Sequence, residues 1–316
     1  MKPQIAVFGN IWPDDALRTL EAPFACHHLA RMSADERRTF LKGPAVQVRG
    51  VLTTGTIGLD AKTAASFPAL EIVSVHGVGV DAVALQPLAR RGVIVTNTPD
   101  VLTEDVADLT VALLLASARR LPLLDRYVRS GHWQEARPLQ LARSLRGKVA
   151  GIYGYGRIGQ AVAMRLRAFG MAIRYFQRSA GPEPSLRCAS LAALAAESDY
   201  LVVCTPGGVA TRHVIDAEVL DALGPEGTLV NIARGSVVDE AALADALSTG
   251  RLGAAALDVF EDEPNVPPAL RALDNVVLTP HVGSFTVEAR QAMRDLAIGN
   301  LLAHFAGKPV LSPVAV

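Results

Sequence analysis

The chain has 316 residues, of which 50% are hydrophobic and 20% charged, and this length suffices for two domains with separate cores. Its 31 Lys and Arg residues balance its 31 Asp and Glu residues, so no net positive field attracts nucleic acid or an anionic membrane. We therefore expect a small-molecule partner. The three cysteines lack CxxC spacing, which argues against a disulfide framework or a thiolate metal site.

Two apolar runs are candidates for a signal peptide or a membrane-spanning segment. The run at residues 4–8 is too short for the core of a signal peptide. The run at residues 111–118 falls well short of the roughly 20 residues that span a bilayer, and two arginines follow it. We expect a soluble protein in the cytoplasm.

The first part of the chain alternates short apolar runs with helical patterns. Ser33 and Glu36 have the spacing of a capping box, which predicts a helix from Ala34 to about Leu41. Strands that alternate with helices predict a parallel sheet covered on both faces. The predicted strands are residues 4–8, 46–53, 71–75 and 93–95.

The turn at residues 76–81 contains two glycines after the third predicted strand. Ligands of open α/β sheets bind at that end of a strand, although an ordinary turn between strand and helix has the same sequence. Residues 97–100, Asn-Thr-Pro-Asp, predict a crossing into a second domain. A long helix then starts with Thr103 as its N-cap and ends near Arg120, and its almost entirely apolar sequence predicts burial.

A second helix at residues 123–130 precedes a connecting arm at residues 132–146, which has no clear period. From residue 149 the alternation of strands and helices resumes, and six strands match a doubly wound dinucleotide domain. The last helix, from about Thr286 to Phe305, is expected to pack on the N-terminal domain because the six-strand unit is complete without it. The six predicted strands are residues 149–153, 172–176, 200–204, 228–231, 254–257 and 276–278.

The sequence Gly-Tyr-Gly-Arg-Ile-Gly at residues 154–159 has the spacing of a dinucleotide-binding turn. A predicted strand precedes it, and a helix that begins near Arg157 follows, so the N–H groups at the helix start would face phosphates. Gly154 permits the tight turn and Gly156 leaves room for a pyrophosphate. Gly159 lets the helix lie close to the strand.

Polar residues follow three successive strands of this second domain: Arg234, Glu263 and His281. Because carboxyl ends of parallel strands lie at one edge of a sheet, we expect these side chains to converge near the nicotinamide of a bound cofactor. Each residue alone is more often part of an ordinary polar loop, but their joint occurrence favours a site. Asp258 lies within an apolar run and needs a partner, which the nicotinamide carboxamide would provide.

These three side chains suit the reduction of a 2-oxo acid. Arg234 offers a planar fork to a carboxylate and polarises the neighbouring carbonyl oxygen. A protonated His281 can donate to that oxygen as hydride reaches the carbon, and Glu263 would orient the imidazole. The hydride itself comes from the cofactor.

Four motifs in this order resemble those of one enzyme family. They are Gly-Tyr-Gly-Arg-Ile-Gly at residues 154–159, Asn-Ile-Ala-Arg-Gly at 231–235, Leu-Asp-Val-Phe-Glu-Asp-Glu-Pro at 257–264 and Thr-Pro-His-Val-Gly-Ser at 279–284. The chain resembles the D-isomer-specific 2-hydroxyacid dehydrogenases, and among them the glyoxylate/hydroxypyruvate and hydroxyphenylpyruvate reductases. The similarity covers essentially the whole chain.

The resemblance implies two Rossmann-like, doubly wound parallel-sheet domains. Residues 1–97 plus 286–316 would form a discontinuous, flavodoxin-like substrate domain, and residues 98–285 would form the dinucleotide-binding Rossmann domain. It also implies a homodimer joined through the cofactor domains. No metal is expected.

By the same resemblance Arg234, Glu263 and His281 form the catalytic set, and the amides of Val78 and Gly79 hold the substrate carboxylate. The expected substrate contacts are Leu52, His76, Val78, Gly79, Arg234 and His281. The expected cofactor contacts are Gly154, Tyr155, Gly156, Arg157, Ile158, Gly159, Gln177, Arg178, Ser179, Cys204, Thr205, Pro206, Ile232, Ala233, Asp258, His281, Gly283 and Ser284.

Two positions depart from commoner members of the family. Gln177 stands where NAD-dependent enzymes place a carboxylate for the ribose hydroxyls. Gln does not repel a 2′-phosphate, and Arg178 and Ser179 can bind one unless Arg178 merely caps the loop, so we predict that NADPH is preferred and NADH possible. Gln140 lies in the arm, where some glyoxylate/hydroxypyruvate reductases place an aromatic residue that reaches the partner's active site.

The sequence thus predicts NAD(P)H-dependent reduction of a small 2-oxo acid, such as glyoxylate, hydroxypyruvate or an aryl pyruvate, to the D-2-hydroxy acid. One alternative is another dehydrogenase on the same scaffold, acting on phosphoglycerate, formate or phosphite. The other is a non-enzymatic cofactor-sensing protein like the corepressors on this fold, which keep the same catalytic residues.

Overall fold

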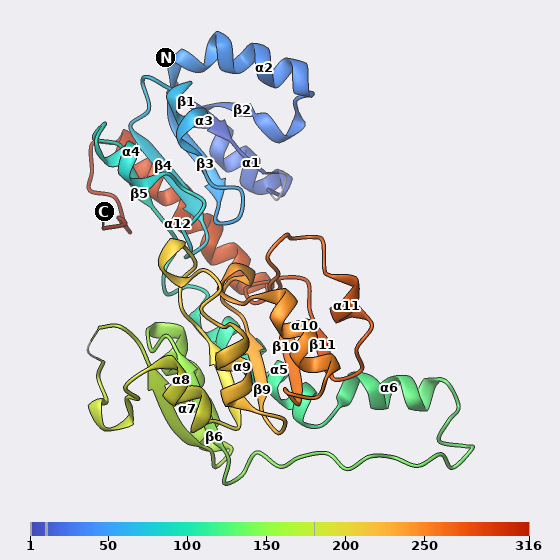
Figure 1. The fold of residues 1–316 in the computed structure, drawn as a ribbon. Helices are drawn as coiled ribbons and strands as arrows, with labels where there is room; N and C mark the ends of the chain where they lie inside the picture. The colour runs from blue at the N-terminus through green and yellow to red at the C-terminus, as the bar shows by residue number, and fades with distance from the viewer. Residues whose placement is uncertain (1, 10–11, 180, 316) are drawn as a thin grey trace. The chain divides into compact units, whose positions relative to one another are not determined.

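The computed structural model describes residues 2–9, 12–179 and 181–315 (Figure 1). The chain divides into two compact units, the first of Met1–Leu102 with Thr286–Val316 and the second of Thr103–Phe285. The first boundary between the units therefore follows residue 102, whereas the sequence predicts it after residue 97. Backbone bonds from Asn97 N to Ser312 O and from Thr98 N to Gly77 O, 3.3 and 2.9 Å long, keep this segment in the first unit.

The first unit is built on a parallel sheet in the order β2-β1-β3-β4-β5, which is the order of flavodoxin-like sheets. β2 is not among the predicted strands, because it is an edge strand whose sequence, Ala-Cys-His-His, lacks an apolar alternation. The strands are β1 (Gln4–Val7), β2 (Ala25–His28), β3 (Val48–Thr54), β4 (Ile72–His76) and β5 (Ile94–Thr96).

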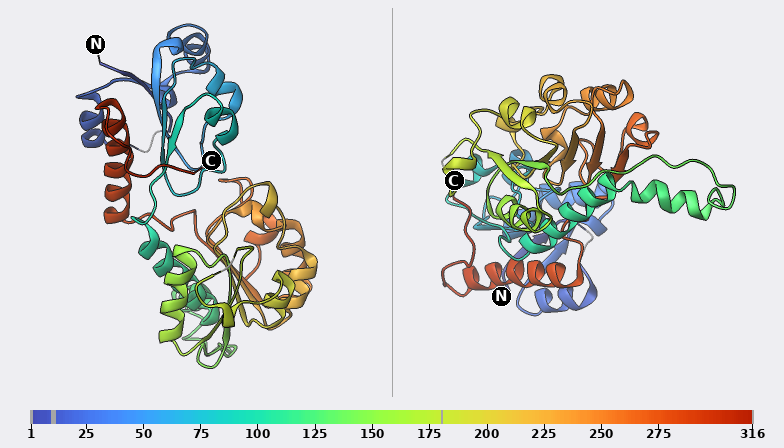
Figure 2. Two further views of the ribbon diagram at one scale, coloured as in Figure 1. Left: turned by 90° about the vertical axis from the view of Figure 1, so that its left-hand side faces the viewer. Right: turned by 90° about the horizontal axis from the view of Figure 1, so that it is seen from below.

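Helices cover both faces of this sheet. Successive side chains of β1 point to opposite faces and therefore enter two different apolar cores. Ile5 and Val7 pack with side chains of α1 and α12, whereas Ala6 packs with those of α2, α3 and α4. Ser74 on β4 donates to the carbonyl oxygen of Ala297 on α12 at 2.8 Å, and the red helix lies beside the blue strands in Figure 2. The helices are α1 (Asp14–Glu21), α2 (Ala34–Lys42), α3 (Ala61–Ala65), α4 (Leu85–Ala89) and α12 (Val287–Phe305).

The predicted capping box at the start of α2 is confirmed. Glu36 N donates to Ser33 Oγ at 3.3 Å, and Ser33 N donates to Glu36 Oε2 at 2.8 Å. Two backbone donors at the helix start are satisfied in this reciprocal way. Thr286 similarly caps α12 by accepting from Ala289 N at 3.1 Å.

The second unit is built on a six-stranded sheet of parallel pairings in the order β11-β10-β9-β8-β6-β7. Five of the six predicted strands keep their predicted bounds, and the sixth, β8, ends one residue earlier at Val203. The strands are β6 (Val149–Tyr153), β7 (Ala172–Phe176), β8 (Tyr200–Val203), β9 (Thr228–Asn231), β10 (Ala254–Leu257) and β11 (Val276–Leu278).

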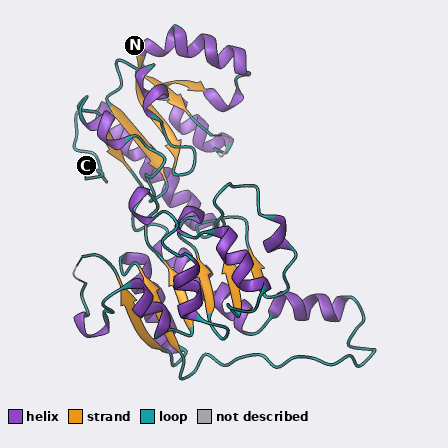
Figure 3. Ribbon diagram, in the orientation of Figure 1, coloured by secondary structure: helices purple, strands orange, loops and turns teal. Residues whose placement is uncertain are grey.

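The helices of the second unit differ slightly from the prediction. Thr103 is the first helical residue of α5 and not its N-cap, and α5 ends at Ala118. Residues 130–148 form neither helix nor strand, so the predicted arm is present as a long loop after α6 (Figure 3). The helices are α5 (Thr103–Ala118), α6 (Leu121–Arg129), α7 (Arg157–Ala168), α8 (Leu191–Ala196), α9 (Ala217–Leu223), α10 (Glu240–Ser248) and α11 (Pro268–Arg271).

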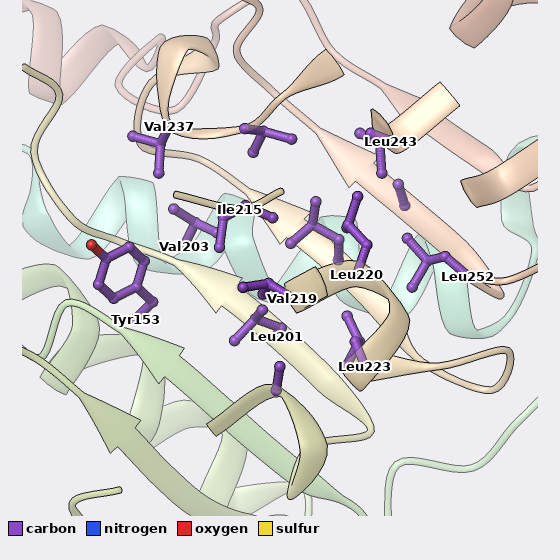
Figure 4. Close-up of a cluster of buried hydrophobic side chains, with 14 of the residues drawn as sticks. Tyr153, Leu201, Val203, Ile215, Val219, Leu220, Leu223, Val237, Leu243 and Leu252 are labelled. Carbon is purple, nitrogen blue, oxygen red and sulfur yellow. The ribbon is translucent and has the colours of Figure 1, made fainter. Parts of the chain in front are cut away.

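An apolar core lies between one face of this sheet and the helices α8, α9 and α10. Leu201 and Val203 of β8 contact this core, together with Leu220 of α9 and Leu243 of α10, all fully buried (Figure 4). Such a core holds the strand ends in place, and these ends carry the candidate chemistry. Among the described residues, no helix is long and apolar enough to cross a membrane.

One histidine is buried in the first unit, at the end of β4. His76 is 4% exposed, and Trp12 packs edge-on against its ring with the ring centroids 5.1 Å apart. Burial, and then the positive charges of Arg290 and Arg294 on α12, lower the pKa of His76 to about 4. The ring is therefore neutral near pH 7.

We expect this neutral histidine to make the free energy of unfolding depend on pH. The ordinary pKa of 6.5 falls to about 4 in the folded chain, so between these values the unfolded chain binds a proton that the folded chain does not. Stability therefore falls as the pH is lowered through this window. In urea unfolding, the free energy of unfolding should fall less between pH 7 and pH 5 in the variant His76→Gln than in wild type. An equal fall in both proteins would contradict the assignment.

Candidate active site

The glycine turn joins β6 to α7 at the point where the strand order reverses. β6 lies between β7 and β8, and ligands of open sheets bind beyond the carboxyl ends at such a reversal. Gly154 has φ +98°, and a Cβ there would come within 2.7 Å of Thr205 N, just beyond β8. Glycine thus allows the turn to pack directly on the end of β8.

The other two glycines of the turn have different surroundings. A Cβ at Gly159 would come within 2.2 Å of Gly154 O, whereas a Cβ at Gly156 would meet no atom within 4 Å. No side-chain hydrogen bond caps α7 at Gly156. An open face beside a helix N-terminus fits the pyrophosphate of a dinucleotide, which the residues 154–159 would hold.

Three candidate residues follow neighbouring strands of the second unit. Arg234 comes after β9, Glu263 after β10 and His281 after β11, and these strands pair in parallel with one another. Their carboxyl ends therefore lie side by side at the sheet edge that also carries the glycine turn.

The carboxylate of Asp258 fixes the loop after β11. Asp258 is 1% exposed, and its Oδ1 accepts from Thr279 Oγ1 at 2.6 Å and from Val282 N at 2.9 Å. Its Oδ2 accepts from Gly283 N at 2.9 Å. Three donors of the protein therefore satisfy this carboxylate within the unit, and its predicted contact with the nicotinamide carboxamide stays a prediction.

His281 is held in a defined position within this loop. Its N–H donates to Asp258 O at 2.7 Å, and its φ of +53° lies in the left-handed region that is uncommon for residues other than glycine. Its Nδ1 lies 2.7 Å from Glu263 Oε2. Since Glu263 engages Nδ1 and the His281 side chain remains 34% exposed, Nε2 is the ring nitrogen that can meet a ligand.

The charges of the three candidate residues act on one another. Burial raises the pKa of Glu263, but the hydrogen bond and charge of His281, the Phe260 amide and the charge of Arg234 outweigh it and lower the pKa below its usual range. The Phe260 amide donates to Glu263 Oε1 at 3.1 Å. The backbone of Arg234 is held separately, because Asn231 Nδ2 donates to Arg234 O at 3.0 Å. Glu263 is therefore an anion that contacts the imidazole of His281.

A second histidine–glutamate pair lies in the same unit, which the sequence analysis did not expect. His213 Nε2 lies 2.9 and 3.0 Å from the two oxygens of Glu261, and Arg212 Nη2 donates to the same carboxylate at 2.5 Å. The partners are far apart in the sequence, so no local pattern predicts the pair. Among the described residues, no group of three or more potential ligands could hold a metal ion.

The segment after β7 contains the residues predicted to select the cofactor. Gln177 Oε1 accepts from Tyr155 N in the glycine turn at 3.1 Å, while Arg178 and Ser179 are exposed. Arg187, which the sequence analysis did not single out, donates through Nη2 to Gln177 O at 3.0 Å and to Arg178 O at 3.2 Å. A second guanidinium group thus lies at this strand end.

Other predicted cofactor residues lie at the ends of the neighbouring strands. Burial raises the pKa of the Cys204 thiol, just after β8, to about 12, so this thiol stays protonated and is no nucleophile. Directly after the strands or in the loop after β11 lie Cys204, Thr205, Pro206, Ile232, Ala233, Gly283 and Ser284.

The glycine turn of the first unit follows β4. Gly77 N donates to Thr98 Oγ1 at 3.0 Å, and Asn97 Nδ2 donates to Val78 O at 2.8 Å. These two polar side chains, which the sequence predicts only as part of a domain crossing, hold the backbone of Gly77 and Val78. Val78 is 38% exposed, so the turn is accessible within its unit.

Two predicted substrate contacts lie in the core of the first unit instead. Leu52 on β3 is 0% exposed and packs in the apolar cluster beneath α12, and His76 is 4% exposed. Alternation along a strand directs these side chains into the packed layers. Their expected contact with substrate is corrected, since they support the first unit from within.

Gln140 lies within the arm and contacts its own unit. Its Oε1 accepts from Arg120, and it lines a cavity of about 300 Å³ with Tyr200, Thr228 and Val276. These last three residues lie at the amino ends of their strands. The cavity is therefore at the opposite sheet edge from Arg234, Glu263 and His281.

A known protein family matches most of the second unit. Residues 111–283 match the family model of the D-isomer specific 2-hydroxyacid dehydrogenase, NAD binding domain. That range contains the glycine turn, Arg234, Glu263 and His281, so the matched family and the assembled site coincide in the second unit.

Proteins of known name resemble the chain over most of its length. A glyoxylate/hydroxypyruvate reductase A of Arabidopsis thaliana is 50% identical over 89% of this chain and 90% of its own. A hydroxyphenylpyruvate reductase of Plectranthus scutellarioides is 52% identical over 88% and 89%. An NADPH-dependent glyoxylate/hydroxypyruvate reductase of Sinorhizobium meliloti, solved with NADP and malonate, is 42% identical, covers 100% of this chain and 97% of its own, and has a TM-score of 0.90. The chain belongs to the D-isomer-specific 2-hydroxyacid dehydrogenases and is an oxidoreductase that uses a nicotinamide dinucleotide.

Proposed function

We propose that the chain reduces a small 2-oxo acid, such as glyoxylate, hydroxypyruvate or an aryl pyruvate, to the D-2-hydroxy acid. The observation that carries the proposal is the 2.7 Å contact between His281 Nδ1 and Glu263 Oε2, at the strand edge that also carries Arg234. The contact leaves Nε2 as the atom that donates a proton to the carbonyl oxygen. A bound nicotinamide cofactor supplies the hydride.

Each residue of the candidate set has one task in this proposal. The guanidinium of Arg234 binds the substrate carboxylate and polarises the carbonyl oxygen. Glu263 keeps the ring of His281 oriented through its contact with Nδ1. The backbone amides of Val78 and Gly79 are proposed as further donors to a carboxylate. A positioned proton donor of this kind contributes about 10²–10⁴ in rate.

The substrate class is supported by the relatives. The Arabidopsis relative is named for glyoxylate and hydroxypyruvate, and the Plectranthus relative for hydroxyphenylpyruvate. These compounds share a carboxylate next to a ketone or aldehyde and differ in the group beyond it. That shared part is what Arg234 and His281 are suited to recognise, so we extend the class to this chain.

We propose that NADPH is the preferred cofactor and that NADH is also accepted. Gln177 carries no charge that would repel a 2′-phosphate, and Arg178 and Ser179 are exposed beside it. The Sinorhizobium relative is described as NADPH-dependent and was solved with NADP. Both observations support the same preference.

We infer that two copies of the chain associate through their cofactor domains. The amphipathic helix α6 has no buried residue, and its Leu121 and Val128 are 51% and 53% exposed. In the following arm Trp133 is 69% and Leu141 96% exposed. A run of exposed apolar side chains favours a protein interface.

The free cysteines fit a reducing compartment, and we propose the cytoplasm.

Replacing His281 with Gln is expected to lower turnover about 10²–10⁴-fold, because the proton donor is lost. The dissociation constant of NADPH, measured by fluorescence titration, should stay within about twofold of wild type. His213→Gln is the matched control, since it breaks the other histidine–glutamate pair and should leave turnover near wild type. Retained turnover in His281→Gln would exclude the proton-donor role.

A panel of 2-oxo acids assayed with both cofactors tests substrate and cofactor together. We expect kcat/KM to be higher with NADPH than with NADH for every accepted acid. The variant Gln177→Asp should reverse this order, because a carboxylate repels the 2′-phosphate and accepts from the ribose hydroxyls. A wild-type preference for NADH would refute the cofactor proposal, and no turnover of any oxo acid would refute the function.

The double variant Val128→Asp, Leu141→Asp is expected to be monomeric in analytical ultracentrifugation, since two charges would be buried in the proposed interface. Wild type should sediment as a dimer. Val209→Asp is the control, because Val209 is 98% exposed outside α6 and the arm and should leave the dimer intact. A monomeric wild-type chain would overturn the inference.

A further inference from the structure

The side chain of Tyr155, inside the glycine turn, is buried within the second unit. It is 2% exposed and stacks on Tyr175 of β7, with the ring centroids 4.2 Å apart and the planes at 10°. Its hydroxyl donates to Glu183 Oε1 at 2.6 Å. Burial, followed by the bond and charge of Glu183, raises the pKa of Tyr155 to about 12, so the hydroxyl remains a donor.

Both oxygens of the Glu183 carboxylate are engaged. Arg167 on α7 donates through Nη2 to Glu183 Oε2 at 2.7 Å. The bond from Arg167, and then that from Tyr155, lower the pKa of Glu183 below its usual range. Glu183 is the only acidic residue between Gln177 and Cys188, so the negative charge of this segment is paired at a fixed place.

The same segment returns to β7 and brings Arg187 to the strand end. Arg187 forms a parallel bridge with Tyr175, and Cys188 N donates to Tyr175 O at 2.8 Å. The guanidinium of Arg187 then reaches the carbonyl oxygens of Gln177 and Arg178, at 3.0 and 3.2 Å. Arg187 is exposed, and its charge lies beside the residues proposed to meet the 2′-phosphate.

We propose that Arg187 is a specificity-determining residue that binds the 2′-phosphate of NADPH together with Arg178, and that Tyr155 and Arg167 are positioning residues that keep the charge of Glu183 paired. Guanidinium groups bind phosphate oxygens through two parallel hydrogen bonds. A carboxylate released nearby would oppose that binding. The inference rests on the proposed preference for NADPH.

Binding without turnover tests the role of Arg187. The dissociation constants of NADPH, NADH and the probe 2′,5′-ADP are measured by isothermal titration calorimetry. Arg187→Met should weaken NADPH and 2′,5′-ADP about tenfold or more, the loss of a hydrogen bond to a charged group, and change NADH less than about twofold. Arg187→Lys should restore part of the loss. Arg174→Met is the control, because Arg174 on β7 pairs with Glu197 at 3.2 Å.

A second arm tests the pairing of Glu183. Arg167→Gln should weaken NADPH more than NADH, because the carboxylate loses its counter-ion. Adding Glu183→Gln removes the charge and should restore the NADPH affinity, which a purely structural role of Arg167 would not do. Equal losses for NADPH and NADH in Arg187→Met, or no recovery in the double variant, would overturn the inference.

The wild-type constants separate this inference from the proposed cofactor preference. If wild type binds NADPH more tightly and the variants keep its ratio of NADPH to NADH affinity, the preference stands and the role of Arg187 fails. If wild type binds both cofactors equally, both proposals fail. A ratio that falls in Arg187→Met and recovers in Arg187→Lys supports both.

Discussion

The buried carboxylate of Asp258 is the constraint on which the candidate site depends. An ionised carboxylate is costly to bury unless donors of the protein replace its water. Asp258 accepts from Thr279, Val282 and Gly283, so satisfying one charge determines the course of the loop after β11. His281 lies within that loop and takes its unusual backbone conformation there. The position of the candidate proton donor is thus set by a charge beneath it.

The parallel sheet extends this order to the other candidate residues. Neighbouring strands lie about 4.8 Å apart, so residues that follow β9, β10 and β11 are brought to one edge. Glu263 can then contact His281, and the charge of Arg234 helps to lower the pKa of Glu263. At the other end of the same edge, the glycine turn packs on the end of β8. One sheet edge therefore holds both the cofactor turn and the side chains suited to the chemistry.

Much of this arrangement could be predicted from local sequence. Five strands of the second sheet keep their predicted bounds, because buried parallel strands are continuous apolar runs. The edge strand β2 was missed because its polar residues carry no such signal. The partners of Asp258, the pair of His213 with Glu261 and the bonds of Arg187 escaped prediction, since each joins residues whose proximity only folding creates.

The sequence by itself determined the alternation of strands and helices, the glycine turn and the residue types at the strand ends, because these depend on periodicity and on local sterics. Only the tertiary structure decided which of those residues meet. It satisfied Asp258 from within, placed Leu52 and His76 in the core, and tied Tyr155 to Glu183 and Arg167. Hydrogen bonds and ion pairs depend on distances of a few ångströms between distant segments, and the packing of the sheets sets those distances.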